Sequence, residues 1–203
     1  MELKKEKNGS GRLAHLSLSN SEIVVGVDFS SDSRVNDLID DPRKDCHLLY
    51  PGRTALNLSR CNYCPEHGKQ PVLFLIDATW PCAKKMVRLS DNLRQLPKIS
   101  FDVTRPSEFF IKHQPEPTCL STVETLHRVL ELFGASGLEA YDEEDARLLL
   151  QPFRRMVEMQ IRYAADPTIP GYRVFGGYSD PSRRKRSLKH TRRSVVWQAT
   201  RGG

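Results

Sequence analysis

The hydrophobic positions of this chain form short uninterrupted runs. From Val72 to Ile76 every residue is apolar, and the run stops at Asp77. An apolar run without alternation is typical of a central parallel strand that is covered on both faces. The sequence predicts strands over residues 23–29, 47–52, 71–77, 98–101 and 108–112. The first is expected to end near Asp28, and the second at the turn made by Pro51 and Gly52.

Helical periodicity fills the segments between and after these strands. The sequence predicts helices over 80–93, 120–134 and 142–165, a short helix within the polar loop 30–45, the start of a helix over 53–58, and a polar loop over 61–71. Pro81 suits a first helical position, and Ser121 with Glu124 has the spacing of a capping box. Pro152 is expected to kink or divide its helix. Strands that alternate with helices predict an α/β fold with a mostly parallel sheet and flanking helices.

The 203 residues are 38% hydrophobic and 28% charged, which suits one α/β domain with tails. We expect a flexible segment over residues 1–12, a folded domain over 13–165 and a basic segment over 166–203. No apolar run reaches membrane-spanning length, and the start of the chain has no secretory signal pattern. Five cysteines, an odd number, favour reduced thiols and a cytoplasmic location.

The net charge of +6 is concentrated near the C-terminus. Residues 181–203 contain eight basic side chains and no acidic one, so the remainder of the chain carries a small negative charge. A basic block of this kind usually contacts nucleic acid, and the alternative is a solvated tail without a partner. The residues predicted to contact RNA are Arg183, Arg184, Lys185, Arg186, Lys189, Arg192 and Arg193.

Polar residues stand where three predicted strands end. Asp77, Asp28 and the turn at Tyr50 are expected at the carboxyl edge of the sheet, where open α/β folds bind their ligands. A cap for the helix that follows is the alternative role of Asp77. Trp80, three residues later, is either part of the core or a platform for a ligand.

Two further clusters have more than one interpretation. The segment 120–124 is complete as a capping box, although a helix N-terminus also offers free amides to a carboxylate or phosphate. Cys61, Cys64 and His67 have spacing that would suit three zinc ligands, but no second Cys pair supplies a fourth. The sequence contains no dinucleotide fingerprint, P-loop, HExxH or GxSxG motif, which weighs against the common ATPase and hydrolase classes.

Several of these stretches together resemble one family. Asp77-Ala78-Thr79-Trp80 is similar to the D-x-T-W signature of the DTW-domain proteins. The other similar blocks are Gly11-Arg12-Leu13-Ala14, Ser19-Asn20-Ser21, Leu49-Tyr50-Pro51-Gly52, Ser90-x-x-Leu93-x-x-Leu96-Pro97 and Leu120-Ser121-Thr122-x-Glu124, in the family's order. The resemblance covers residues 11 to 165 approximately.

The resemblance implies a tRNA-uridine aminocarboxypropyltransferase that uses S-adenosylmethionine. Such enzymes transfer the 3-amino-3-carboxypropyl arm of that donor, rather than its methyl group, to N3 of a uridine in tRNA. The resemblance also implies a SPOUT-like fold with a C-terminal trefoil knot. Many relatives carry an N-terminal cysteine cluster that looks like a zinc site; this chain begins downstream of it, so no metal is expected. A monomer without a membrane or protein partner is expected as well.

The same resemblance suggests roles for individual residues. Asp77 is expected to be the catalytic residue, either as the base that takes the N3 proton or as an anchor for the cofactor's amino group. The residues expected to bind S-adenosylmethionine are Tyr50, Pro51, Gly52, Thr79, Trp80, Leu120, Ser121, Thr122 and Glu124. Alternative functions are an RNA methyltransferase, a non-catalytic RNA-binding module and a small zinc protein built on the Cys61–His67 loop.

Overall fold

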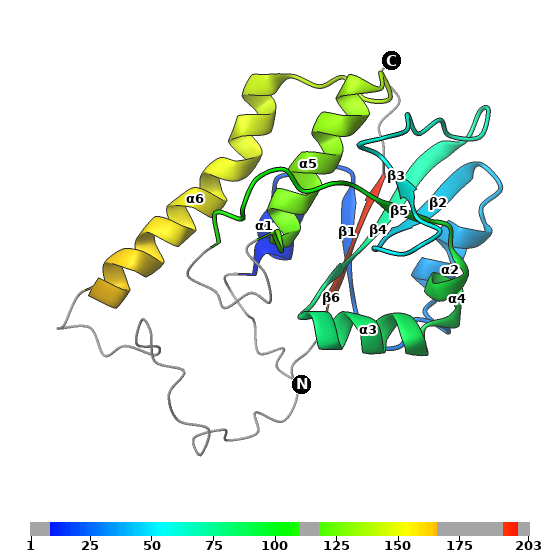
Figure 1. Ribbon diagram of the computed structural model, residues 1–203. Helices are drawn as coiled ribbons and strands as arrows, with labels where there is room; N and C mark the ends of the chain where they lie inside the picture. Colours follow the sequence, from blue (N-terminus) through cyan, green and yellow to red (C-terminus); the bar gives the residue numbers. More distant parts are fainter. Residues whose placement is uncertain (1–8, 110–117, 166–192, 199–203) are drawn as a thin grey trace.

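A computed structural model describes residues 9–109, 118–165 and 193–198, which form a six-stranded sheet with helices on both faces (Figure 1). The strands are β1 (Ser21–Val25), β2 (Lys44–Leu49), β3 (Leu56–Asn57), β4 (Gln70–Asp77), β5 (Lys98–Ser100) and β6 (Arg193–Gln198). The helices are α1 (Ser10–Leu16), α2 (Ser33–Asp40), α3 (Trp80–Leu89), α4 (Asp91–Gln95), α5 (Thr122–Ala135) and α6 (Glu143–Ala165). No helix in these described ranges has the length and apolarity needed to cross a membrane.

The strand order is β1-β6-β4-β2-β5-β3. The strands from β4 to β3 are parallel to one another, whereas β6 runs antiparallel to both of its neighbours, β1 and β4. The expectation of a mostly parallel sheet with flanking helices is therefore confirmed. The sequence pattern did not predict β6, which lies between β1 and β4 although it comes from the basic segment.

Strand β4 lies between two hydrophobic clusters, which explains its apolar run. Leu73 and Leu75 pack on one face with residues of α1, α5 and α6. Val72 and Phe74 pack on the other face with residues of α2, α3 and α4. Because successive side chains of a strand point to opposite faces, a strand that is covered on both sides is apolar throughout.

Several predicted elements differ from the structure. Strand β1 ends at Val25, so Asp28 lies in the following loop rather than at the strand end. The chain turns at Gly26, where an added Cβ would lie 2.8 Å from the ring of Phe29, and this close approach lets the ring enter the core. Residues 53–58 do not begin a helix, because Leu56 pairs with Ile99 of β5 and forms β3.

Further differences concern helix and strand limits, and they include β2, which spans Lys44–Leu49 rather than residues 47–52. The helix predicted over 80–93 is divided at Ser90 into α3 and α4. Glu108 and Phe109 are not in a strand, and residues 110–112 lie outside the described ranges. Helix α6 continues through Pro152 without division.

Candidate functional site

Asp77 ends β4 and meets the start of α5, which begins 45 residues later in the chain. The hydroxyl of Thr122 donates a hydrogen bond to Asp77 Oδ1 at 2.6 Å. The N-cap residue of α3 is Thr79, not Asp77, so the helix-cap interpretation of Asp77 is not supported. The geometry therefore joins the two stretches that carry the Asp77–Trp80 and Leu120–Glu124 blocks.

The first turn of α1 closes the other side of Asp77. A Cβ added to Gly11 would lie 2.6 Å from the carboxyl carbon of Asp77, so only glycine fits at this distance. The backbone amide of Thr122 donates to Ser10 Oγ at 3.3 Å, and both Ser10 and Gly11 are buried. Sequence analysis gave these two residues no role in a site. It assigned residues 1–12 to a flexible segment, so it offered no signal of this close approach.

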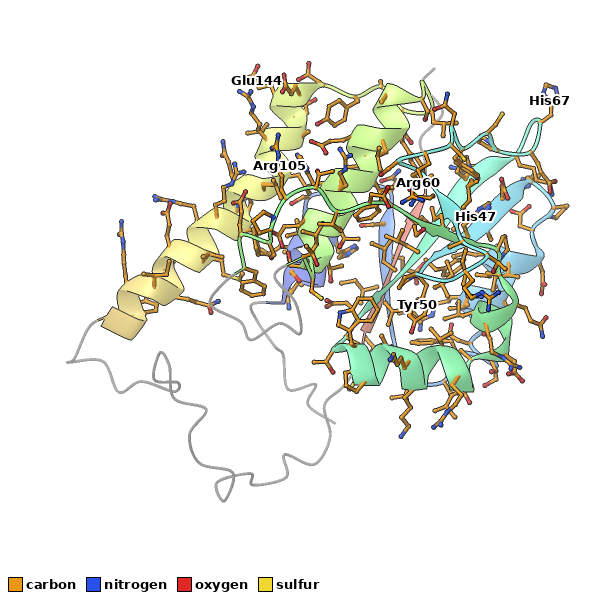
Figure 2. All side chains as sticks on the ribbon, viewed as in Figure 1. His47, Tyr50, Arg60, His67, Arg105 and Glu144 are labelled. Carbon is orange, nitrogen blue, oxygen red and sulfur yellow. The ribbon has the colours of Figure 1, made fainter. Side chains whose placement is uncertain are left out.

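Trp80 lies at the surface beside Tyr50. Its side chain is 38% exposed, so the core interpretation is wrong, and its ring centroid lies 6.3 Å from that of Tyr50 in an edge-on arrangement. Figure 2 shows Tyr50 directly above α3, which starts at Trp80. Burial raises the pKa of Tyr50 above its ordinary value.

The rest of the predicted cofactor set lies in two places. Pro51, Gly52 and Thr79 are exposed in the turns that follow β2 and β4. Leu120 is half-buried immediately before the buried N-cap Ser121. The ends of β2 and β4 are adjacent in the sheet, so the structure brings these turns to the same edge as Asp77.

Glu124 performs the capping role and also fixes a neighbouring loop. Its Oε2 accepts from the amide of Ser121 at 2.7 Å, which completes the capping box of α5. The same oxygen accepts from the hydroxyl of Ser107, and Oε1 accepts from the amide of Glu108 at 2.6 Å. Both carboxylate oxygens therefore bind protein groups, and Glu124 holds the start of α5 in place.

The cysteine loop does not join this edge of the sheet. Cys61 and Cys64 are exposed, whereas Tyr63 between them is buried and donates to Asp45 Oδ2 at 2.7 Å. Figure 2 places His67 at a loop tip, at the opposite end of the strands from Tyr50. In the ranges that the structure describes, no group of three or more His, Cys, Asp or Glu residues is arranged to hold a metal ion.

Most of the predicted RNA-binding residues lie outside the described ranges. Arg183, Arg184, Lys185, Arg186, Lys189 and Arg192 belong to this group, whereas Arg193 begins β6. In the register of the sheet, Arg193 pairs with Asp77 on one side and with Val25 on the other. The basic segment therefore enters the sheet at the edge where Asp77 lies.

A hollow of about 510 Å³ lies elsewhere, between the end of α1, α5 and the start of α6. None of the predicted site residues lines it. Its border includes Glu139, Asp142 and Asp145, which makes it acidic. An acidic hollow repels polyanions, and the hydrogen-bonded edge at Asp77 is the better candidate site because two separate sequence blocks meet there.

The side chains at this edge of the sheet offer a carboxylate, hydroxyls and an aromatic ring to a ligand. Asp77 supplies a carboxylate that is suited to an ammonium group or a proton. Thr122 and Ser121 supply hydroxyls, and the exposed ring of Trp80 is suited to a cation or a purine. The set matches a small ligand that carries both a positive charge and an aromatic base.

Comparisons with known proteins identify the family of this chain. The sequence model described as the DTW domain matches residues 1–161. The tRNA-uridine aminocarboxypropyltransferase 2 of Drosophila melanogaster is 35% identical over 115 residues, which are 56% of this chain and 42% of that protein. The proteins of the same name from Macaca fascicularis and Mus musculus are 27% and 28% identical, over 58% of this chain and 37% of each relative.

The chain thus spans less than half the length of these curated relatives. No solved structure matches it significantly. The family match nevertheless extends over most of the chain and includes Asp77, Trp80 and Thr122. The chain belongs to the DTW-domain family.

Proposed function

We propose that this protein transfers the 3-amino-3-carboxypropyl group of S-adenosylmethionine to N3 of a uridine in tRNA. The hydrogen bond from Thr122 to Asp77 is the observation that carries the proposal, because it assembles the two signature blocks at one ligand-binding edge. The names of the curated relatives support the reaction class and the tRNA substrate.

The residues at this edge fit S-adenosylmethionine by their donor and acceptor chemistry. Trp80 and Tyr50 offer aromatic surface to the adenine or the sulfonium. Asp77 offers a carboxylate to the amino group or to the uridine, and the turns with Pro51, Gly52 and Thr79 are exposed beside them. Bound there, S-adenosylmethionine supplies an activated carbon next to a sulfonium, which is already a strong electrophile.

The balance of the proposed reaction is simple. The bond from sulfur to the arm's methylene carbon breaks, the bond from N3 to that carbon forms, and 5′-methylthioadenosine leaves. The N3 proton must go to a base or to water, since a uridine nitrogen is protonated at neutral pH. The protein's main task is to place the methylene rather than the methyl in line with N3, which is a problem of orientation.

Asp77 is the group that we assign to the N3 proton. Thr122 occupies Oδ1 and Gly11 packs against the carboxyl group, so the side chain is held in one orientation. A positioned carboxylate of this kind can accept a proton or orient the base, for a rate gain of about 10²–10⁴. Glu124 contributes indirectly, because it fixes the helix start from which Thr122 projects.

The basic segment is proposed to bind the tRNA. Residues 183–192 precede Arg193 in the chain, and Arg193 pairs with Asp77, so at most about 35 Å of extended chain separates this segment from the site. We also propose a SPOUT-like fold with a C-terminal knot, a monomeric state and a cytoplasmic location. The insertion of β6 between β1 and β4 supports an unusual C-terminal topology.

Mass spectrometry of the tRNA product tests the reaction. Incubation with tRNA and S-adenosylmethionine should give a uridine that is heavier by an aminocarboxypropyl group. A methyl increment would instead identify a methyltransferase. An absence of cofactor binding in calorimetry would identify a binding module without catalysis.

The Asp77→Asn variant tests the assigned base. The amide keeps an oxygen that can accept from Thr122, so folding and cofactor affinity should remain close to those of the original protein. Transfer should fall about 10²–10⁴-fold, because an amide cannot take the N3 proton. Asp28→Asn is the matched control, since Asp28 is an exposed loop carboxylate that accepts from Ser30, and it should leave the rate unchanged. Full turnover by Asp77→Asn would contradict the base assignment, and a selective loss of cofactor binding would identify Asp77 as an anchor.

A further inference from the structure

Helix α3 presents three cationic side chains to solvent directly beside the site. Lys84, Lys85 and Arg88, here called the α3 cations, are exposed, whereas Met86 and Val87 on the opposite side are buried in the core. Lys84 and Arg88 are one helical turn apart, so their Cβ atoms are about 6 Å from each other. Figure 2 shows the side chains of α3 that point away from the sheet, with no other described element beyond them.

No carboxylate neutralises this surface within the described structure. The segment 80–90 contains no acidic residue, and the α3 cations form no ion pair with any described group. On α6, by contrast, Arg147, Arg154 and Arg155 each lie within 3.7 Å of a glutamate oxygen. The charge of the α3 cations is therefore available to an external anion.

Two other unneutralised cations stand near the same edge of the sheet. Arg12 follows Gly11, which packs against Asp77, and Arg53 follows the turn after Tyr50. Neither forms an ion pair with a residue in the described ranges. Cations thus stand on α1, in the turn after β2 and on α3, the elements that adjoin Asp77, Tyr50 and Trp80.

We infer that the outward face of α3, with Lys84, Lys85 and Arg88, binds phosphates of the RNA next to the nucleotide that enters the site. An exposed aromatic ring bordered by unpaired cations is the pattern of a single-stranded nucleic-acid surface, in which bases stack and cations follow the backbone. This inference rests on the proposed function for the identity of the RNA. It places part of the recognition on the folded domain, separate from the basic segment.

A membrane surface fits these observations less well. A helix that lies in a lipid interface buries its apolar face among the acyl chains. The apolar face of α3 is already buried, since Ala83, Met86 and Val87 pack toward the sheet. The exposed side of α3 carries the α3 cations beside two partly exposed apolar side chains, Trp80 and Leu89, and this mixed surface suits phosphates and bases that are approached from solvent.

A charge-matched pair of triple variants of the full chain tests the inference. The test variant is Lys84→Gln, Lys85→Gln and Arg88→Gln, which keeps much of each side-chain stem. The control is Arg43→Gln, Lys44→Gln and Lys69→Gln, which removes the same charges at the amino ends of β2 and β4, the edge opposite Asp77. Binding of an unmodified tRNA transcript is measured by fluorescence anisotropy over a range of salt concentrations, with calorimetry of S-adenosylmethionine in parallel.

We expect the test variant to bind tRNA at least about 10-fold more weakly at physiological salt and to flatten the plot of log K against log salt by about 2–3 units. Its affinity for S-adenosylmethionine should be unchanged, and the control should bind tRNA like the original protein. The charge-keeping variant Lys84→Arg, Lys85→Arg and Arg88→Lys should restore tRNA binding, which excludes a folding defect as the cause.

Equal tRNA binding by the test variant and the control would overturn the inference, even if product formation confirms the transferase. A test variant that loses binding only to phosphatidylserine vesicles, and not to tRNA, would overturn it in favour of a membrane surface. If the original protein binds no S-adenosylmethionine yet its tRNA binding depends on the α3 cations, the surface is supported and the proposed function fails.

Discussion

At the scale of single residues, the site depends on how closely α1 and α5 approach the carboxylate of Asp77. Asp77 was singled out by its place after an apolar run, and Thr122 by the family resemblance of the Leu120–Glu124 block. Their contact at 2.6 Å was not predicted, because no local pattern records which strand end meets which helix start. The role of Gly11 was also hidden, since its importance comes from a neighbour 66 positions away.

Gly11→Ala should reduce transfer by about 10–100-fold. The new methyl group would lie 2.6 Å from Asp77 Cγ and must push that side chain out of line, and misplacement by about 1 Å is enough for such a loss. Gly9→Ala is the control, because its Cβ would lie 3.9 Å from Asp77 Oδ2, an ordinary contact. Steady-state rates of both variants with tRNA measure the effect. Equal rates would show that Asp77 tolerates displacement.

Cys46 should be alkylated far more slowly than Cys61 and Cys64. Burial raises the pKa of the Cys46 thiol to about 11, so little reactive thiolate exists at neutral pH, and the side chain is 8% exposed. Cys61 and Cys64 are exposed. A time course with iodoacetamide, followed by peptide mass spectrometry in buffer and in urea, measures the difference. Rapid labelling of Cys46 in buffer would contradict the placement of β2 in the core.

At the scale of elements, the strands that were predicted best are those whose burial is complete. β4 matched its prediction closely because both faces are covered, so its sequence carries the signal by itself. β3 was missed because its two residues become a strand only through pairing with β5, and pairing between distant segments overrides local preference. The break between α3 and α4 was missed for a similar reason, since it depends on contacts with the distant loop after β1. There the hydroxyl of Ser30 donates to the carbonyl of Leu89 and accepts from the amide of Asp91.

Ser90→Ala should lower the free energy of unfolding by about 1–3 kcal/mol. Ser90 is fully buried, and its hydroxyl oxygen accepts from the amide of Phe29 at 3.0 Å, so the substitution leaves a buried donor without a partner. Ser17→Ala removes an exposed hydrogen bond to Leu13 and should change the free energy by less than about 0.5 kcal/mol. Urea unfolding measures both. A Ser90 variant as stable as the Ser17 variant would contradict this role for the Ser90–Leu93–Leu96 block.

At the scale of the whole molecule, β6 completes the sheet. It pairs with all five residues of β1 and with Val72 to Asp77 of β4. Sequence analysis assigned the basic segment to RNA contact, or alternatively to a solvated tail, because basic residues dominate its composition, and so the six-residue strand β6 was missed. The two-sided core, by contrast, followed from the apolar pattern alone.

Removal of residues 193–203 should therefore destabilise the folded domain severely. Without β6, the strand β1 has no partner within the described sheet, and β4 exposes an edge of unpaired backbone groups. Removal of residues 199–203 alone is the control, because it leaves every residue of β6 in place. Thermal unfolding by circular dichroism and light scattering measures stability and aggregation. A cooperative transition at the same temperature in both proteins would refute the central position of β6.

The position of β6 also has a consequence for synthesis on the ribosome. Strand β1 emerges more than 160 residues before the strand that pairs with it, so the domain cannot close its sheet while most of its core is already translated. Pairings of such long sequence separation are slow to form, and exposed strand edges aggregate during the delay. We therefore expect the sheet to close only after residue 198 has left the ribosome, and folding to be sensitive to chaperone supply. Chains that are stalled before residue 193 should be captured by holdases, whereas the 203-residue chain released from the ribosome should not.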